Sequence, residues 1–507
     1  MVCLISLCLW RNHSFFHDDT YITLRYASHL LDGFGPIWNK QGPRVEGFTS
    51  PLHMLLVAAV GWTGIPLTMA ARVVNVTSHL ALLLFIYLYL RRRAGSLGAQ
   101  LGVTLVGASW MFIIWDLGGL DAVLYATLAT IGVLVATSGF YAEEEGRSRL
   151  LVLGSLILAF GTLARPEGSL LLGGAWILVL IAPGMTARDR VRTLGASIGV
   201  AAIILVPVEI FRWTYFHAIA PNTMYAKIGG IDRQTLVVLG VRYLARFVLM
   251  PPFLGVFAAA ATVFSLIRRR DKVHYAAIWM FIGLNALFVV VSGGDHMLAF
   301  RFCLSMYALL AIVLVLSLAQ NGLLDQPFAG PAICVVLVLA LALQIRPHML
   351  NPKQTDAAAS VGKMVGIYIR THWPTGSTVA LNTAGSTPFY ADDMQYIDML
   401  GLNDAQIARR KNIPTKGPWS HLVGHLKGDG ASVLARKPDF IILGPSEGTT
   451  PELHEKIYFI GDYEIGKSPF FQENYKVCTA DVSESVVLTY YQRRDLGYPC
   501  PAEKSSL

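Results

Sequence analysis

Two adjacent carboxylates stand in the stretch of the sequence that is richest in reactive side chains. Asp18 and Asp19 lie in HDDTYITLRYASHLLDGFGPIWNK, directly after a short apolar segment. A carboxylate beside an apolar surface is costly to desolvate, so it needs a partner or a chemical task. One member of such a pair can stay ionised as a general base that deprotonates a hydroxyl, while the other orients a substrate or a basic residue. The alternative is structural, because aspartate before TYITLRYASHLL also suits a helix start.

A basic and an acidic residue follow in the same loop. Arg44 and Glu46 lie close together in PRVEGFTSP, just before an apolar segment. They could form a salt bridge that holds the loop in shape, or they could contact a ligand. The sequence leaves both possibilities open.

Four further polar clusters interrupt the apolar runs downstream. Arg165 suits a phosphate, because its planar guanidinium matches the phosphate oxygens, but it could equally pair with Glu167. Asp121 could act at a site or cap the helix that follows it. His296 is not assigned to a metal, because no second histidine lies nearby in the sequence. The clusters are Asp121 in LGGLDAVLY, Arg165 and Glu167 in ARPEG, Asn222, Tyr225 and Lys227 in APNTMYAK, and Asp295, His296 and Arg301 in GGDHMLAFRF.

Together these residues predict one site for acid–base and phosphate chemistry. Its carboxylates would activate a hydroxyl, and its cations would hold a phosphate. We predict no cofactor and no metal site, because there is no glycine-rich nucleotide loop and the cysteines lack metal-ligand spacing; a divalent ion remains compatible with the pattern. Cys478 and Cys500 either pair with each other or stay free thiols.

The composition indicates that lipid surrounds the elements that position these residues. Hydrophobic residues make up 54% of the 507-residue chain and charged residues 15%, against about 45–50% and about 25% in soluble proteins. The net charge of +8 does not indicate nucleic acid, because the basic residues fall in short clusters between apolar runs, as in membrane loops. We therefore expect an α-helical polytopic membrane protein that contacts membrane lipid and no nucleic acid.

The apolar runs predict about eleven spanning helices, since a span needs about 20 mostly apolar residues. Met1–Trp10 is interpreted as the end of a first spanning helix. Thr49–Ile65 is apolar but short, and is interpreted as a surface or re-entrant helix. The other predicted spans are Leu67–Leu90, Leu97–Trp115, Ala122–Tyr141, Leu150–Leu163, Ser169–Ile181, Leu194–Phe211, Phe247–Ile267, Tyr275–Val291, Phe302–Leu318 and Ala329–Ile345.

Basic loops set the predicted orientation and the domain boundary. Basic clusters at 91–93, 147–149, 188–192 and 268–272 fall in alternate loops, which the positive-inside rule places in the cytoplasm. The polar clusters and everything after Pro347 then lie on the periplasmic or extracellular side. We predict a transmembrane module over residues 1–348, with its first external loop at 12–50, and a soluble α/β domain over 349–507. In that domain SVGKMVGIYIRTHW is typical of a helix, and STVALNT, DFIIL and VVLTYY are typical of strands.

The motifs and their order resemble the C-type (GT-C) glycosyltransferases. The resemblance runs along nearly the whole chain, and the loop with the aspartate pair and RVEG is its most specific part. Among these enzymes the chain is most similar to the mycobacterial terminal β-arabinofuranosyltransferase and its bacterial relatives. The motifs are HDDTYITLRYASHLLDGFGPIWN, RVEGFTSPLH, LGGLDAVLY, ARPEG, PNTMYAK, GGDHMLAFRF and YIDMLGLND.

The resemblance implies a multi-pass enzyme of a bacterial inner membrane with a periplasmic C-terminal domain. Such an enzyme moves a sugar, with inversion, from a polyprenyl-phosphate carrier to a hydroxyl of a cell-envelope glycan or lipid; only the likeness suggests arabinofuranose. Asp18 or Asp19 would be the base. The soluble domain would either help to hold the acceptor or serve as a stabilising lid without substrate contact. Arg165, Lys227, Arg301, Tyr225 and Asn222 would bind the donor and its phosphate, and Arg44, Glu46, Asp121, Glu167, Asp295 and His296 would bind substrate or shape the site.

A transporter or flippase of lipid-linked sugars is the alternative function. Transporters place ionisable groups near the bilayer midplane, often in repeated halves. Here the predicted spans are nearly free of charge, and no internal repeat stands out. An exported binding module on a membrane anchor would need far fewer apolar segments than this chain has.

Overall fold

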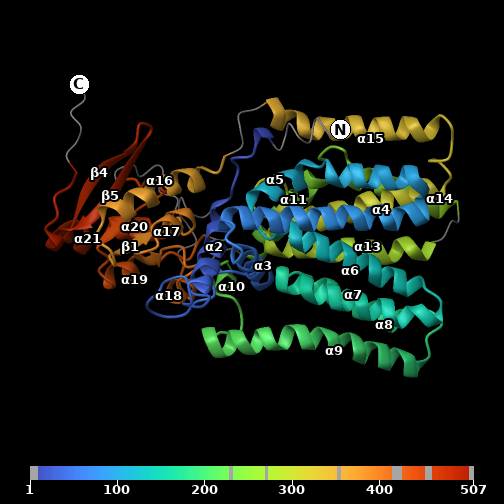
Figure 1. Ribbon diagram of the computed structural model, residues 1–507, viewed down its shortest axis with the longest axis horizontal. Coiled ribbons are helices and arrows are strands. Elements are labelled where there is room, and N and C mark those ends of the chain that lie inside the picture. Colours follow the sequence, from blue (N-terminus) through green and yellow to red (C-terminus); the bar gives the residue numbers. More distant parts are fainter. Residues whose placement is uncertain are drawn as a thin grey trace.

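The computed structural model describes residues 10–227, 232–268, 272–350, 355–413, 425–450 and 459–501. These residues form a helical bundle with an α/β domain at one end, and helix α2 (Asp18–Leu31) lies between the two (Figure 1). Most of the predicted remnant of a first span, residues 1–9, falls outside the described ranges.

Apolar helices build the bundle, and five of those described are long and apolar enough to cross a membrane. These five are α4 (Leu67–Gly107), α6 (Ala122–Tyr141), α7 (Glu144–Ala164), α9 (Ala187–Phe211) with the π-helical turn η1 (Arg212–Phe216), and α14 (Leu304–Gln320) with the 3₁₀ turn η2 (Arg301–Cys303). Shorter apolar helices are α3 (Pro51–Gly61), α8 (Gly168–Ile181), α12 (Leu254–Ile267), α13 (Lys272–Ser292) and α15 (Ala329–Leu350). The remaining bundle helices are α5 (Trp110–Gly118), α10 (Asn222–Lys227) and α11 (Arg233–Val248).

Two predicted spans are wrong in their bounds because the backbone breaks inside them. The prediction Leu97–Trp115 crosses the end of α4 and the start of α5, where Ser109 caps the new helix by accepting from the Met111 N–H. The prediction Phe247–Ile267 crosses the two prolines at 251–252, which separate α11 from α12. Helix α11 was not predicted, because Arg242 and Arg246 interrupt its apolar residues before they form a long apolar run.

Helix α3 has the length expected of a surface or re-entrant helix. It has 11 residues, which at about 1.5 Å per residue give about 16 Å, roughly half of a bilayer's apolar thickness. Its length fits the predicted surface or re-entrant helix, which stays a prediction.

The α/β domain has a five-stranded sheet in the order β2-β1-β3-β5-β4. Strands β2, β1 and β3 are parallel, whereas β5 and β4 run antiparallel. The predicted helix and three strands are present, and β2 and β4 were not predicted. The elements are α16 (Ala357–His372), β1 (Thr378–Leu381), α17 (Ser386–Tyr390), β2 (Gln395–Asp398), α18 (Ala405–Ala408), α19 (Gly430–Ala435), β3 (Phe440–Ile442), α20 (Ile460–Gly466), α21 (Pro469–Asn474), β4 (Tyr475–Ser483), β5 (Val486–Arg493) and η5 (Arg494–Leu496).

A disulfide bond joins β4 to the end of the described chain. Cys478 and Cys500 have Cα atoms 5.4 Å apart and are bonded. Of the two alternatives that the sequence left open, the structure therefore has the pair rather than free thiols.

Candidate active site

The first of the two adjacent aspartates is committed to the α/β domain. Asp18 is buried, and its Oδ1 accepts from the backbone N–H and the hydroxyl of Ser386, both at 2.7 Å. Its Oδ2 accepts from the Gly385 N–H at 3.2 Å. Burial raises the pKa of Asp18 to about 6, although the hydrogen bonds from Ser386 oppose this. Asp18 thus behaves as an anion held at the junction of the two parts of the protein.

The second aspartate has an open carboxylate among positive charges. Asp19 is only partly buried, and none of the described residues donates a hydrogen bond to its carboxylate. Burial alone would raise its pKa, but the nearby charges of His17, Lys227, Arg301 and His425 outweigh that effect and lower the pKa to about 2. Neither aspartate caps α2, because the cap is His17, whose Nδ1 accepts from the Asp19 N–H at 3.2 Å.

The GGDH segment places an acid against Arg301. Asp295 Oδ2 accepts from Arg301 Nε at 2.9 Å, and the guanidinium of Arg301 lies 5.8 Å from the centre of the Trp115 ring. Gly294 has a φ of +79°, and a Cβ there would lie 2.8 Å from Tyr243 Cβ of α11. The close approach of α11 to this glycine therefore sets where Asp295 and Arg301 sit.

Arg165 pairs with the two carboxylates that precede and follow it in the sequence. Its Nη1 lies 3.1 Å from Asp121 Oδ1, and its Nε donates to Glu167. Asp121 makes no side-chain cap to α6, so the capping alternative is wrong for this residue. The charge of Arg165 also acts on Lys227. Arg165 therefore belongs to the same electrostatic cluster, with two acids already bound to it.

The two charged residues of the RVEG loop do not pair with each other. Glu46 is buried against Arg212, with Oε2 and Nε 2.6 Å apart and Oε1 and Nη2 3.2 Å apart. Arg44 is exposed and lies 4.3 Å from the centre of the Tyr215 ring. Arg212 was not singled out in the sequence, where it follows an apolar run. Its charge at the end of a long apolar helix was the available signal.

Helix α10 divides its three candidate residues between two tasks. Asn222 Nδ2 donates to the carbonyls of Gly401 and Leu402 at 2.8 and 3.0 Å, so it contacts the α/β domain. The Tyr225 ring lies 5.1 Å from the guanidinium of Arg409. Lys227 is exposed, and its charge acts on Asp19. Of the three residues, only Lys227 acts on the carboxylate of Asp19.

The YIDMLGLND segment of the α/β domain closes over the first loop. Asp398 ends β2, is fully buried and holds the turn by accepting from the Asn403 N–H and side-chain amide at 2.8 and 2.9 Å. Asn403 in turn accepts from the Tyr26 hydroxyl at 3.1 Å. A Cβ at Gly47 would lie 1.8 Å from Asn403 Oδ1, so RVEG needs its glycine for this contact. Asp398 and Asn403 stood in a quoted motif but were not identified as site-shaping residues.

One face of α2 carries further contacts to the α/β domain. Arg25 and His29 are four residues apart and fully buried, as expected for neighbours on one helical face. Arg25 Nη1 lies 2.8 Å from Asp392 Oδ1, and His29 Nε2 lies 2.7 Å from the same oxygen. This aligned charge network holds α2, and with it Asp19, in one position.

A second histidine accompanies His296. This second histidine is His425 of the α/β domain, and its ring centre lies 5.2 Å from that of His296. Even so, within the described ranges no three His, Cys, Asp or Glu side chains gather closely enough to hold a metal ion. The prediction of no metal stays a prediction.

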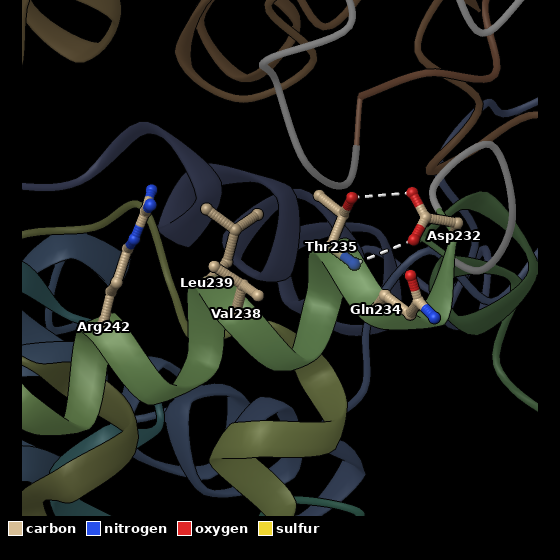
Figure 2. A pocket seen from close by; sticks show the side chains of 6 residues that line it. All are labelled: Asp232, Gln234, Thr235, Val238, Leu239 and Arg242. Atoms are coloured by element: carbon tan, nitrogen blue, oxygen red, sulfur yellow. Dashed lines mark hydrogen bonds between the residues drawn. The ribbon is translucent and has the colours of Figure 1, made fainter.

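A separate cavity lies along α11. Figure 2 shows Thr235, Val238, Leu239 and Arg242 projecting from the same side of this helix, beside Asp232. Asp232 caps the helix by accepting from the Thr235 N–H and hydroxyl at 2.9 and 2.6 Å. None of the predicted site residues lines this cavity, and its one acid is already engaged in the cap.

Comparison with known proteins supports both the fold and the resemblance. Residues 348–493 match a family described as a domain of unknown function, DUF8728. The terminal β-(1→2)-arabinofuranosyltransferase of Mycobacterium tuberculosis is 31% identical over 244 residues, which cover 45% of this chain and 37% of that protein. The enzyme of the same name from Corynebacterium glutamicum is 31% identical over 242 residues, covering 41% of this chain and 32% of that protein. The chain thus matches only about a third of the length of these relatives.

Solved structures match the chain over nearly its whole length. ArnT from Cupriavidus metallidurans superposes with a TM-score of 0.59 in the apo state, at 12% identity and 98% coverage of both chains. The same protein bound to undecaprenyl phosphate gives a TM-score of 0.56, with 98% of this chain and 99% of that chain covered. An oligosaccharyltransferase of Archaeoglobus fulgidus gives 0.54 at 12% identity, with 98% and 74% covered. The chain therefore has the fold of ArnT, and its predicted sequence resemblance to the terminal arabinofuranosyltransferases is confirmed.

Proposed function

We propose that this protein is a multi-pass membrane glycosyltransferase that moves a sugar from a polyprenyl-phosphate carrier to a hydroxyl of a cell-envelope glycan. The observation that carries the proposal is the open carboxylate of Asp19 beside the cations Lys227 and Arg301. A general base needs a free, ionised acceptor, and a phosphate needs cations close to it. Both requirements are met by residues of one cluster.

In the proposed reaction Asp19 takes the proton of the acceptor hydroxyl as its oxygen attacks the anomeric carbon. The bond from that carbon to the phosphate oxygen breaks, and the polyprenyl phosphate leaves with the electron pair. One displacement of this kind inverts the anomeric carbon. Lys227 and Arg301 would stabilise the negative charge that grows on the phosphate. Asp295 holds Arg301 in place for this task.

The donor sugar that we propose first is arabinofuranose. The two curated relatives that match by sequence carry that activity in their names. ArnT, which shares the fold, was solved with undecaprenyl phosphate, a lipid carrier of the proposed class. Both facts belong to those proteins and support the choice of donor to test.

We place the site and the α/β domain on the periplasmic side of a bacterial inner membrane. The arginine-bearing starts of α7 and α9 lie at the end of the bundle away from the α/β domain (Figure 1). The positive-inside rule assigns such ends to the cytoplasm. The disulfide between Cys478 and Cys500 fits an oxidising compartment.

The test uses the full chain purified in detergent and a panel of polyprenyl-phosphate sugars with an arabinofuranose oligosaccharide as acceptor. We expect transfer from at least one donor, and a loss of kcat of about 10²–10⁴-fold in D19N, since a positioned general base contributes about that much. A D19N variant that keeps full turnover would contradict the assignment of the base. Uptake of a fluorescent lipid-linked sugar into vesicles, without transfer, would favour a flippase.

A further inference from the structure

We infer that His425 of the α/β domain and His296 of the bundle form an imidazole pair that binds the acceptor sugar beside Asp19. This inference rests on the proposed function and adds the residues that recognise the second substrate. It assigns the α/β domain a direct part in the site, through one side chain.

The pair is formed by two parts of the chain that meet only in the folded protein. The rings of His296 and His425 have centres 5.2 Å apart and planes at 78°, an edge-to-face arrangement. The charge of His425 acts on Asp19, and the charge of Asp19 acts on His296. The acceptor hydroxyl must reach Asp19, so a sugar bound for transfer would lie close to these two rings.

Both imidazoles are reachable from water. The side chain of His296 is 59% exposed, and His425 is partly exposed. The backbone of His425 is nevertheless held in place, because its neighbour Leu426 is buried against Ile460 of α20. The ring of Phe459 lies 6.4 Å from that of His425 and limits its movement on one side. The pair is therefore accessible and also positioned.

The chemistry of imidazole fits hydroxyl groups better than it fits a lipid phosphate. A neutral imidazole has one donor and one acceptor nitrogen, and a sugar hydroxyl also donates and accepts. The C–H face of a sugar can also pack against an aromatic ring, and the side chain of His296 is exposed enough to offer one. The cations Lys227 and Arg301 come from the bundle and already suit the phosphate. A lipid-linked donor comes from the bilayer, whereas a glycan acceptor comes from the water side, where the α/β domain lies.

The test is steady-state kinetics of the full-length protein with H425A, H425Q and H296A. We expect the acceptor KM to rise about tenfold in H425A and H296A, as after loss of a hydrogen bond and its contact, with the donor KM changed less than about twofold. H425Q keeps a donor and an acceptor and should recover part of the acceptor KM. The matched control is H372A, because His372 is an exposed histidine on α16 that stacks on Tyr368 within its own helix. That variant should match the wild type.

An unchanged acceptor KM in both H425A and H296A would overturn the inference, and so would a raised donor KM with an unchanged acceptor KM. Binding of an arabinofuranose oligosaccharide to the detergent-purified protein, measured by calorimetry, is read independently of turnover. If the wild type transfers no sugar from any donor, the proposed function fails. The inference about the histidine pair is then tested by oligosaccharide binding alone. It requires that H425A weakens this binding about tenfold and that H372A does not.

Discussion

Asp18 and Ser386 are 368 residues apart in the sequence, yet both the backbone N–H and the hydroxyl of Ser386 donate to one carboxylate oxygen of Asp18 at 2.7 Å. The neighbouring Asp19 receives no such donor from the described residues and faces cations instead. Two adjacent residues of one type therefore have different surroundings: Asp18 joins the bundle to the α/β domain, whereas no described residue donates a hydrogen bond to the carboxylate of Asp19.

Removing the donors or the acceptor at this junction should loosen it. S386A deletes one hydrogen bond to a buried carboxylate and should lower the free energy of unfolding by about 1–3 kcal/mol. D18A leaves two backbone N–H groups without their acceptor and should lower the free energy of unfolding by more than S386A does. Thermal unfolding and the rate of proteolytic release of the α/β domain measure both effects. S360A is the control, because that exposed hydroxyl bonds only to carbonyls at the start of its own helix; an equal loss there would contradict the junction.

The ionisation of Asp19 should depend on Lys227. The pKa of Asp19 is lowered to about 2 from 3.8, so its carboxylate stays charged until the pH falls well below 4. K227M removes one of the charges that lower this pKa, and the acid limb of kcat/KM should therefore move to higher pH. K476M serves as control, since Lys476 of β4 donates to the Tyr498 carbonyl. Identical acid limbs in K227M and the wild type would place Lys227 away from the base.

The buried ion pair of the RVEG loop should be far more sensitive than the exposed arginine two residues away from it. R212A leaves Glu46 buried without its partner and should cost about 3–5 kcal/mol of stability. R44A removes only an exposed cation–π contact, worth about 0.5–1 kcal/mol. Thermal unfolding in detergent compares the two variants. The double variant E46L/R212M should regain stability over R212A, because no buried charge then lacks a partner.

A buried acid in the α/β domain should make stability depend on pH. Asp462 accepts from the Asn382 amide at 2.9 Å and the Gly444 N–H at 2.8 Å, and burial raises its pKa from 3.8 to about 7. Its contribution is fully present below pH 4 and is lost as the pH rises through 7, by up to about 1.4 kcal/mol per pH unit. D462N should flatten that slope between pH 4 and 7, as read from the melting temperature. A slope equal to that of the wild type would show that Asp462 titrates normally.

Several features of the fold could be predicted from local sequence patterns. Apolar runs indicated most of the bundle helices, and β-branched runs indicated β1, β3 and β5. Helices end at the prolines at 251–252 and before the Ser109 cap, but the apolar residues continue through both places. The predicted helix bounds were therefore wrong there. Strand β2 was missed because its sequence QYID has polar residues at both ends and a single β-branched residue, Ile397.

The sequence determined that lipid surrounds much of this chain, that its reactive side chains fall into a few short motifs, and that these motifs follow the order found in a known family. Hydrophobicity and residue spacing are local properties, so they can be read without coordinates. The tertiary structure decided which aspartate is open, that Glu46 pairs with Arg212, and that Gly47 lies against Asn403. The role of a charged or polar side chain depends on what folding brings next to it, and here the decisive neighbours lie more than a hundred residues away in the sequence.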